Sequence, residues 1–304
     1  MARRGLSRPA GEIRFQEPPS HDKWIKGRLT GSLRLSLEIP TGQFVSPSTG
    51  RLTLVSQGAE EVVAQEAARL AGTPVIPGSG IKGAVRTLYE LLSFSCDPFA
   101  WADRARRTEA SRCTARSCCD ACSLFGVLGR SGRVGFDDAR PAGPDAVRVE
   151  VQKVPVPWTP QKPEGDVSLY DFQEATVFDR DRKVSVKQLK ELSREVFLGT
   201  FENRMTFWNV SVEELGRLLL SMGIGRDEAT RFLLRLGGVK YDGKGAVKVQ
   251  PRSLTLASPE RKHFEGEPLQ EQASAWLEAA RTSAWAVPFW PKLEEVAKLL
   301  RGPA

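Results

Sequence analysis

PVIPGSGIKGAVRTLYE, at residues 74–90, is the stretch that says most about the fold. Pro77 and Gly78 interrupt the chain, and Ser79 is placed to cap a helix that begins here. Apolar residues then recur at helical spacing, namely Ile81, Ala84, Val85, Leu88 and Leu92. A second stripe of the same helix holds Lys82, Arg86 and Tyr89. The stretch therefore predicts a turn followed by an amphipathic helix with a basic face.

The start of this helix has the features of a phosphate-binding site. A glycine-rich helix start exposes backbone amides, and the positive end of the helix dipole favours an anion. Lys82 and Arg86 add two cations one turn apart. A basic face that only contacts solvent explains the same spacing. The glycines lack the G-x-x-x-x-G-K-S/T spacing of a P-loop, so we do not expect nucleotide hydrolysis.

All five cysteines of the chain fall between residues 96 and 122. Cys119 and Cys122 have the two-residue spacing that lets two thiolates hold one zinc ion. We expect Cys96 and Cys113 to complete a structural four-thiolate zinc site, with Cys118 as the spare, although Cys118 can replace Cys119. The negative charge would be offset by nearby Arg112, Arg116 and Lys82. The alternative is that the cysteines are free and packed as small apolar side chains.

Alternating apolar residues predict three strands. Together with the predicted helices, these strands make the fold class α+β. The first alternation runs from Leu33 to Ile39, the second is VRVEV at 147–151, and the third is FENRMTFWNV at 201–210. Residues 211–214 (SVEE) form a capping box that starts a helix. The buried side of that helix is expected to hold Leu215, Leu218, Leu219 and Met222.

A glycine-rich loop, LGGVKYDGKG at 236–245, leads into another apolar strand at 246–249. Glycines let a backbone approach a phosphate chain closely, and Lys240 and Lys244 add positive charge. A flexible turn is an equally good explanation of this composition. The loop is therefore a candidate RNA contact, but its sequence alone does not distinguish a phosphate contact from a flexible turn.

A segment rich in proline and charge, residues 155–182, interrupts the pattern of strands and helices and looks inserted. Its aromatic residues can stack on nucleobases, or they can pin the loop onto its own domain. These residues are Trp158, Tyr170 and Phe172. The C-terminal region has further aromatic residues, which we interpret as a closing layer, namely Trp276, Trp285, Phe289 and Trp290.

The chain divides into a core with extensions at both ends. We expect a flexible basic arm at 1–27, a core at 28–258 and a C-terminal helical extension at 259–304. The core would carry two insertions, a zinc-binding one at 95–123 and a thumb-like one at 153–184.

The charge balance favours a polyanionic partner. The 304 residues include 44 Lys and Arg against 37 Asp and Glu, a net charge of +7. No apolar run approaches the roughly 20 residues of a membrane-spanning helix, and the first residues lack the apolar core of a signal peptide. We therefore expect a cytoplasmic protein without a membrane partner.

The chain resembles the RAMP superfamily of CRISPR effector proteins, specifically the backbone subunits of type III and related complexes. The resemblance rests on segments in a fixed order: IPGSGIKGAVR (76–86), Cys119-x-x-Cys122 with SLFG (123–126), GRVGFDDA (132–139), FENRMTFWNVSVEELGRLLL (201–220) and LGGVKYDGKGAV (236–247). It implies a ferredoxin-like core, similar to an RNA recognition motif, with an inserted zinc-binding loop and a thumb hairpin.

The resemblance also implies partners and contacts. The partners would be a crRNA guide, complementary target RNA, copies of the chain itself and other CRISPR effector subunits. Ser79, Lys82 and Arg86 would contact the guide backbone, the loop 237–245 would be the family's glycine-rich loop, and 155–182 would be the thumb. Family members with cysteines in this region bind zinc there.

One departure from the family bears on catalysis. Backbone subunits that cut target RNA use an aspartate in the loop after the first strand, and here that loop, residues 41–57, has no Asp or Glu. Metal-assisted cleavage needs such a carboxylate, so we expect binding without cutting. Asp137 and Asp138 are better explained by a capping or solvated role. The alternatives are a target-cleaving or crRNA-processing ribonuclease, which His21 and His263 support poorly, and a zinc-stapled protein scaffold without RNA binding.

Overall fold

The structure is a computed structural model, and it describes residues 3–6, 11–57, 59–96, 113–155, 167–170, 191–257 and 261–302. Its core is a ferredoxin-like arrangement in which two strand-helix-strand units form one antiparallel sheet. The units are β2 (Leu29–Glu38), α1 (Gly78–Leu91) and β9 (Val134–Phe136), then β13 (Glu191–Val210), α3 (Val212–Ser221) and β15 (Ala246–Leu256). The strands lie in the order β15, β2, β13, β9. This confirms the predicted α+β, ferredoxin-like class.

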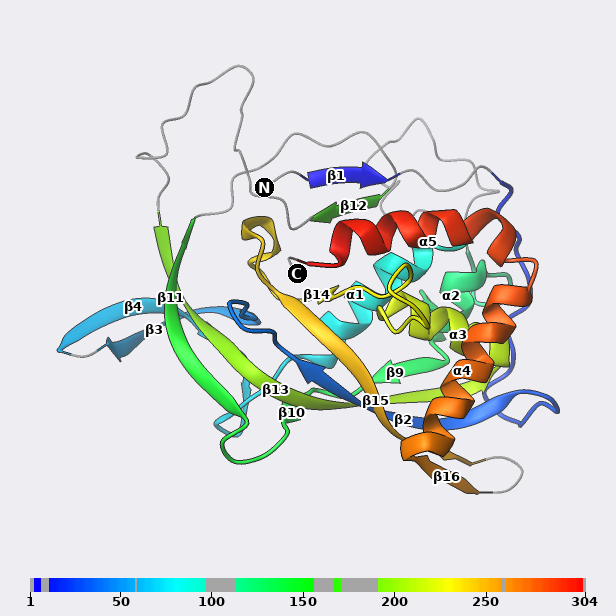
Figure 1. The fold of residues 1–304 in the computed structure, drawn as a ribbon, viewed down its shortest axis with the longest axis horizontal. Coiled ribbons are helices and arrows are strands. Elements are labelled where there is room, and N and C mark those ends of the chain that lie inside the picture. Colours follow the sequence, from blue (N-terminus) through cyan, green and yellow to red (C-terminus); the bar gives the residue numbers. More distant parts are fainter. Residues whose placement is uncertain are drawn as a thin grey trace, which may run out of the picture.

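The alternation seen in the sequence decides which face of this sheet is buried. Leu33, Leu35 and Leu37 of β2 are buried, and Arg34 between them is exposed. In β13 the apolar residues Phe201, Met205 and Phe207 are buried on the same face as Asn203, and Glu202, Arg204 and Thr206 between them are exposed. The buried side chains form one hydrophobic cluster with α1 and α3. The helices therefore cover one face of the sheet, as Figure 1 shows, and the other face carries polar residues.

Helix α3 begins at the predicted capping box. The hydroxyl of Ser211 accepts from the amide of Glu214, and the Glu214 carboxylate accepts from the amide of Ser211. The same carboxylate binds Arg133, whose side chain is fully buried. Arg133 also donates to the carbonyls of Ser123 and Asn209. One arginine thus joins the GRVGF strand to α2 (Asp120–Phe125) and α3.

Strand β13 changes partners along its length. Its second half pairs with β2 and β9, and its first half pairs with β11 (Val147–Pro155). Gly199, with a φ of 109°, lies between the halves, where a side chain would meet the carbonyl of Ala146. The pairing of β11 and β13 brings Pro155 opposite Glu191. The predicted thumb therefore leaves and rejoins the core on paired strands, and within it only β12 (Val167–Tyr170) is described, paired with β1 (Arg3–Leu6).

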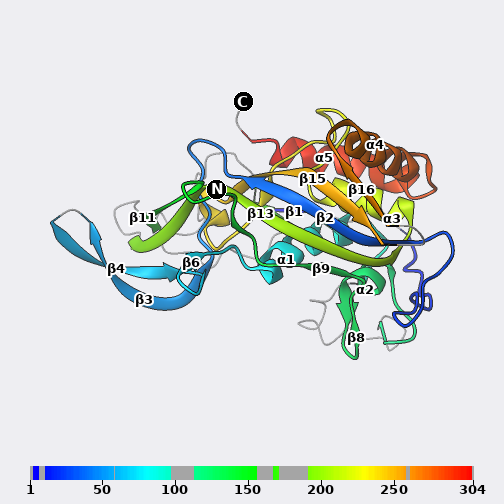
Figure 2. The ribbon, with the colours of Figure 1, turned by 90° about the horizontal axis from the view of Figure 1, so that it is seen from below.

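A second hairpin, β3 (Ser48–Gln57) and β4 (Glu60–Ala67), projects from the sheet at the end opposite the C-terminal helices, as Figure 2 shows. Residues 41–57 were expected to form one loop. This prediction is wrong for residues 48–57, which form strand β3. Short strands complete the fold: β5 (Arg69–Leu70), β6 (Thr73–Pro74), β7 (Gly126–Val127), β8 (Arg130–Ser131), β10 (Arg140–Pro141), β14 (Leu234–Arg235) and β16 (Lys262–Glu265).

The C-terminal region forms α4 (Gly266–Thr282) and α5 (Ala286–Leu300). Helix α4 packs against α3 so closely that a Cβ at Gly216 would lie 2.0 Å from the carbonyl oxygen of Trp276. Trp285 and Phe289 are buried, and the Trp285 ring nitrogen donates to the carbonyl of Leu92 after α1. The aromatic residues thus form the expected closing layer.

Residues 11–27 of the N-terminal arm are attached to the core. Gln16 pairs with Cys118 through both backbone hydrogen bonds, each 2.9 Å. The amide of Ile25 donates to the Asn209 side chain at 3.0 Å. Among the helices that the structure describes, none has the length and apolarity needed to cross a membrane.

Candidate metal centre and nucleic-acid interface

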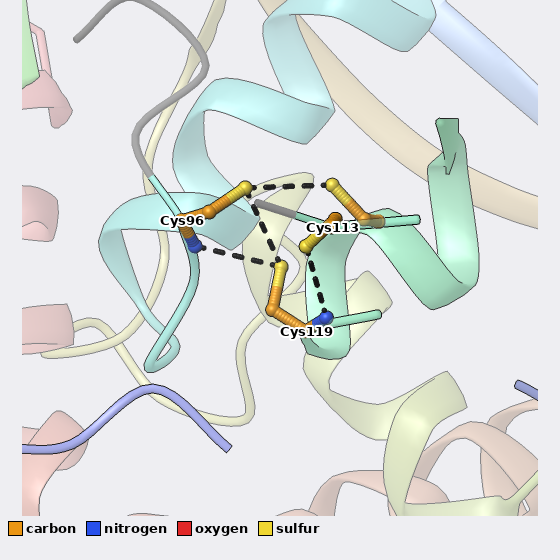
Figure 3. Close-up of side chains that lie close together, drawn as sticks. Cys96, Cys113 and Cys119 are labelled. Atoms are coloured by element: carbon orange, nitrogen blue, oxygen red, sulfur yellow. Dashed lines mark hydrogen bonds between the residues drawn. The ribbon is translucent and has the colours of Figure 1, made fainter. Parts of the chain in front are cut away.

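Four cysteines meet at the end of α1 and the start of α2. The sulfur atoms of Cys96, Cys113, Cys119 and Cys122 lie within 4.8 Å of one another. Cys96 Sγ is 3.5 Å from Cys122 Sγ and 3.7 Å from Cys119 Sγ. Figure 3 shows Cys96, Cys113 and Cys119 converging from separate segments of the chain. Four thiolates around one zinc ion at about 2.3 Å are about 3.8 Å apart, so the cluster has the dimensions of a tetrahedral site.

The surroundings of the cluster favour a thiolate at Cys119. The amide of Cys119 donates to Cys113 Sγ at 3.2 Å, and the amide of Cys96 donates to Cys119 Sγ at 3.5 Å. Hydrogen bonds from Cys113, Cys122 and Cys96 lower the pKa of Cys119. Cys118 takes no part, because its thiol donates to the Thr114 carbonyl at 2.8 Å. The structure thus places the four predicted ligands together and leaves Cys118 as the spare.

Arg86 supplies the positive charge next to the sulfur atoms. Its guanidinium donates to Cys122 Sγ at 3.4 Å, to the Gly126 carbonyl at 3.2 Å and to Glu90 at 2.7 Å. Among the residues named for this role from the sequence, Arg116 is exposed and Arg112 lies outside the described residues. The spacing of residues around Arg86 could not reveal its contact with Cys122, because the two residues are 36 positions apart in the sequence. These contacts tie Arg86 to the cysteine cluster, and its contact with the guide backbone stays a prediction.

The first amide of α1 is already bound within the chain. Helix α1 begins at Gly78 with Pro77 as its N-cap, so the prediction that Ser79 caps the helix is wrong. Instead the Asp138 carboxylate accepts from the amide of Gly78 at 2.8 Å. Asp138 therefore has the predicted capping role, and its negative charge occupies the position that was expected to bind phosphate. Asp137 forms an ion pair with Arg204 at 2.8 Å.

The next turns of α1 present an open surface. Ser79, Gly80 and Gly83 are exposed, and a Cβ at either glycine would have no atom within 4 Å. Glycine inside a helix is less favourable than alanine by about 1 kcal/mol, and no neighbour in this part of the structure requires it here. Lys82 lies half-buried between the glycines, and burial, followed by the charge of Arg86, lowers its pKa. The surface therefore leaves room for the backbone of a bound polymer to approach α1 closely.

The glycine-rich loop lies over the loop that follows β2. Gly238 N donates to the Ser46 carbonyl and Gly245 N donates to the Phe44 carbonyl, both at 2.9 Å. Lys244 donates to the Gly42 carbonyl at 3.0 Å. Lys240, within a 3-10 turn (Lys240–Asp242), is half-buried, and burial, followed by the charge of Arg235, lowers its pKa. Lys244 thus lies against the loop that follows β2, and Lys240 lies beside Arg235.

Not all of the predicted RNA contacts can be placed. Phe172 lies outside the described residues, and for Tyr170 only the backbone, in β12, is described.

A family model, the RAMP superfamily, matches residues 41–248. The chain belongs to the RAMP superfamily. No curated protein matches it. Membership of the RAMP superfamily favours a CRISPR-associated, RNA-binding function, and the match includes α1, all four clustered cysteines and the glycine-rich loop.

Proposed function

We propose that this RAMP protein is a guide-binding backbone subunit of a type III-like CRISPR ribonucleoprotein, which polymerises along the crRNA and holds the guide-target duplex. The observation that carries the proposal is the exposed surface of α1, where Ser79 and two unhindered glycines flank Lys82. Lys240 and Lys244 of the glycine-rich loop are the second set of proposed contacts. Such a surface holds the sugar-phosphate backbone, while base pairing with the guide provides the sequence specificity.

The four-cysteine cluster is proposed to bind one structural zinc ion. Four thiolates fill a tetrahedral site, so no position is left for a reacting water. Bound zinc would fix Cys96, which follows α1, to Cys119 and Cys122 at the start of α2. Its proposed role is to hold these two helices together.

The proposed subunit binds RNA without cutting it. Residues 41–57 contain no carboxylate, although metal-assisted cleavage needs one to hold the ion. Asp137 and Asp138 are the other carboxylates that were considered for cleavage. Asp137 forms an ion pair with Arg204, and Asp138 accepts from the amide of Gly78 at the start of α1. If the assembled complex cuts RNA, another subunit would supply the carboxylates.

Titration of labelled single-stranded RNA with the purified protein, at several salt concentrations, tests this function. Lys82→Gln should weaken binding severalfold and reduce the salt slope by about 0.7, the value for one phosphate contact on a single strand. Lys298 is an exposed lysine on α5, so Lys298→Gln is the matched control. It should change neither the RNA affinity nor the salt slope.

Gly83→Leu separates an effect on binding from an effect on folding. Because its Cβ would meet nothing within 4 Å, the variant should be at least as stable as the wild type, since leucine is the better helix former. RNA binding should nevertheless fall. A wild type that binds no RNA would favour the scaffold alternative, and RNA cleaved in the presence of divalent metal would favour the ribonuclease.

A further inference from the structure

Two buried polar atoms lie opposite each other where the β3–β4 hairpin joins the sheet. Arg194 of β13 and Gln65 of β4 are partners in the parallel pairing of these strands. Arg194 is only 8% exposed, and its Nε has no hydrogen-bond partner. The Oε1 atom of Gln65 is also buried without a partner. Partners in such a pairing point to the same face of the sheet, so that face carries a donor and an acceptor that both lack a partner.

The nearest carboxylate in the sequence cannot neutralise Arg194. Glu195 is the next residue along β13, so its side chain points to the opposite face. There it binds Arg69 through both carboxylate oxygens, at 2.6 and 2.8 Å, and accepts from the Ala67 amide at 2.9 Å. Within the described residues, no acidic side chain is paired with Arg194. A buried guanidinium without a counter-charge is unfavourable and needs an explanation.

The guanidinium lies directly below the glycine-rich loop. A Cβ at Gly238 would be 2.9 Å from Arg194 Nη1, so a larger residue at this exposed position would displace the arginine. The loop is held above Arg194 by Val239, which belongs to the same hydrophobic cluster as Val196, and by the Tyr241 hydroxyl, which donates to the Pro155 carbonyl at 2.6 Å. Nη1 of Arg194 therefore lies beside the exposed backbone of Gly238.

We propose that Arg194 and Gln65 form a ribose-phosphate site that distinguishes RNA from DNA. Arg194 donates to a phosphate, which supplies the missing negative charge. A phosphate diester has no hydrogen to donate, so the Gln65 acceptor needs another group, and the 2′-hydroxyl of the adjoining ribose provides one. The inference rests on the proposed RNA-binding function and extends its contacts to two residues that the sequence did not indicate.

The test compares binding of labelled RNA and of DNA of the same sequence by the full chain. Gln65→Leu should lower the affinity for RNA about three- to tenfold, the effect of losing one neutral hydrogen bond, and leave the affinity for DNA unchanged. Arg194→Gln should weaken both and reduce the salt slope for RNA by about 0.7. Gly238→Ala should reproduce the Arg194 effect because its Cβ displaces the guanidinium.

Thermal unfolding of the same variants shows whether Arg194 has only a structural role. Arg194→Gln should be as stable as the wild type or more stable, because it removes a buried charge without a partner. The inference is overturned if the wild type binds RNA but Gln65→Leu retains its full preference over DNA, which would indicate an internal Arg194–Gln65 contact only. If the wild type binds no RNA, the proposed function itself fails.

Discussion

Replacing Arg133 with methionine tests the reasoning about the buried core. The Arg133 side chain has no exposed surface, and it donates to Glu214 Oε1 at 2.5 Å, to the Asn209 carbonyl at 2.7 Å and to the Ser123 carbonyl at 3.0 Å. Methionine fills similar space but leaves Glu214 buried without its main partner. Breaking one side of a buried ion pair costs about 3 to 5 kcal/mol, which corresponds to a fall in Tm on the order of 10 °C.

The same variant should show a characteristic pH dependence. Burial alone would raise the pKa of Glu214, but the hydrogen bond and charge of Arg133, together with the Ser211 amide and Arg28, lower it to about 2. A carboxyl whose pKa is lowered by folding stabilises the protein above its unfolded pKa of about 4.3, and this contribution is lost as the pH falls towards 2. In Arg133→Met the pKa of Glu214 rises, so the stability deficit should be large at pH 7 and smaller at pH 4.

Urea unfolding of both proteins at pH 7 and pH 4 measures this difference. Arg226→Met is the matched control, because Arg226 forms an ion pair with Glu278 at 3.0 Å between side chains that are 59% and 45% exposed. Such a surface pair contributes at most about 1 kcal/mol. Equal losses in the two variants, or a deficit in Arg133→Met that does not shrink at pH 4, would refute the assignment of Arg133 and Glu214 as a coupled pair.

Two further predictions concern the metal and the helix packing. Cys119→Ser should lose the bound zinc found by elemental analysis of the wild type, whereas Cys118→Ser should retain it because that thiol is bonded to Thr114; equal zinc contents would rule out the site. Gly216→Val should destabilise the protein by about 3 kcal/mol, because its Cβ would lie 2.0 Å from the Trp276 carbonyl; an unchanged melting temperature would contradict the α3–α4 contact.

Features decided by neighbours in the sequence could be predicted well. The alternation of Leu33, Leu35 and Leu37 identified β2 because a strand has a period of two. The capping box at Ser211 identified the first residue of α3, since both of its hydrogen bonds lie within four residues. Cys118 was recognised as the spare because adjacent side chains rarely reach one ion.

Features decided by distant residues could not be predicted. Asp138 reaches the start of α1 across a separation of 60 residues, and no local pattern at Gly78 shows that its amide is already bound. The β3–β4 hairpin was missed although Leu52 and Leu54 alternate, because the resemblance presented this region as a loop. Arg194 sits within a strand like any other residue, and only the fold shows that Gly238 lies above it.

Helix α1 connects the two candidate sites, and this explains why they lie next to each other. Its first turns present the exposed glycines and Lys82, and its last turns are held by Arg86, which contacts Cys122, and by Trp285. A surface that binds a polymer in a defined register must itself be held in place by a second set of contacts. The cysteine cluster can provide such contacts at the end of α1, because Cys96 lies shortly after the helix and packs within the hydrophobic core. We therefore interpret the proposed metal centre as a support for the proposed RNA-binding surface and not as a second, separate function.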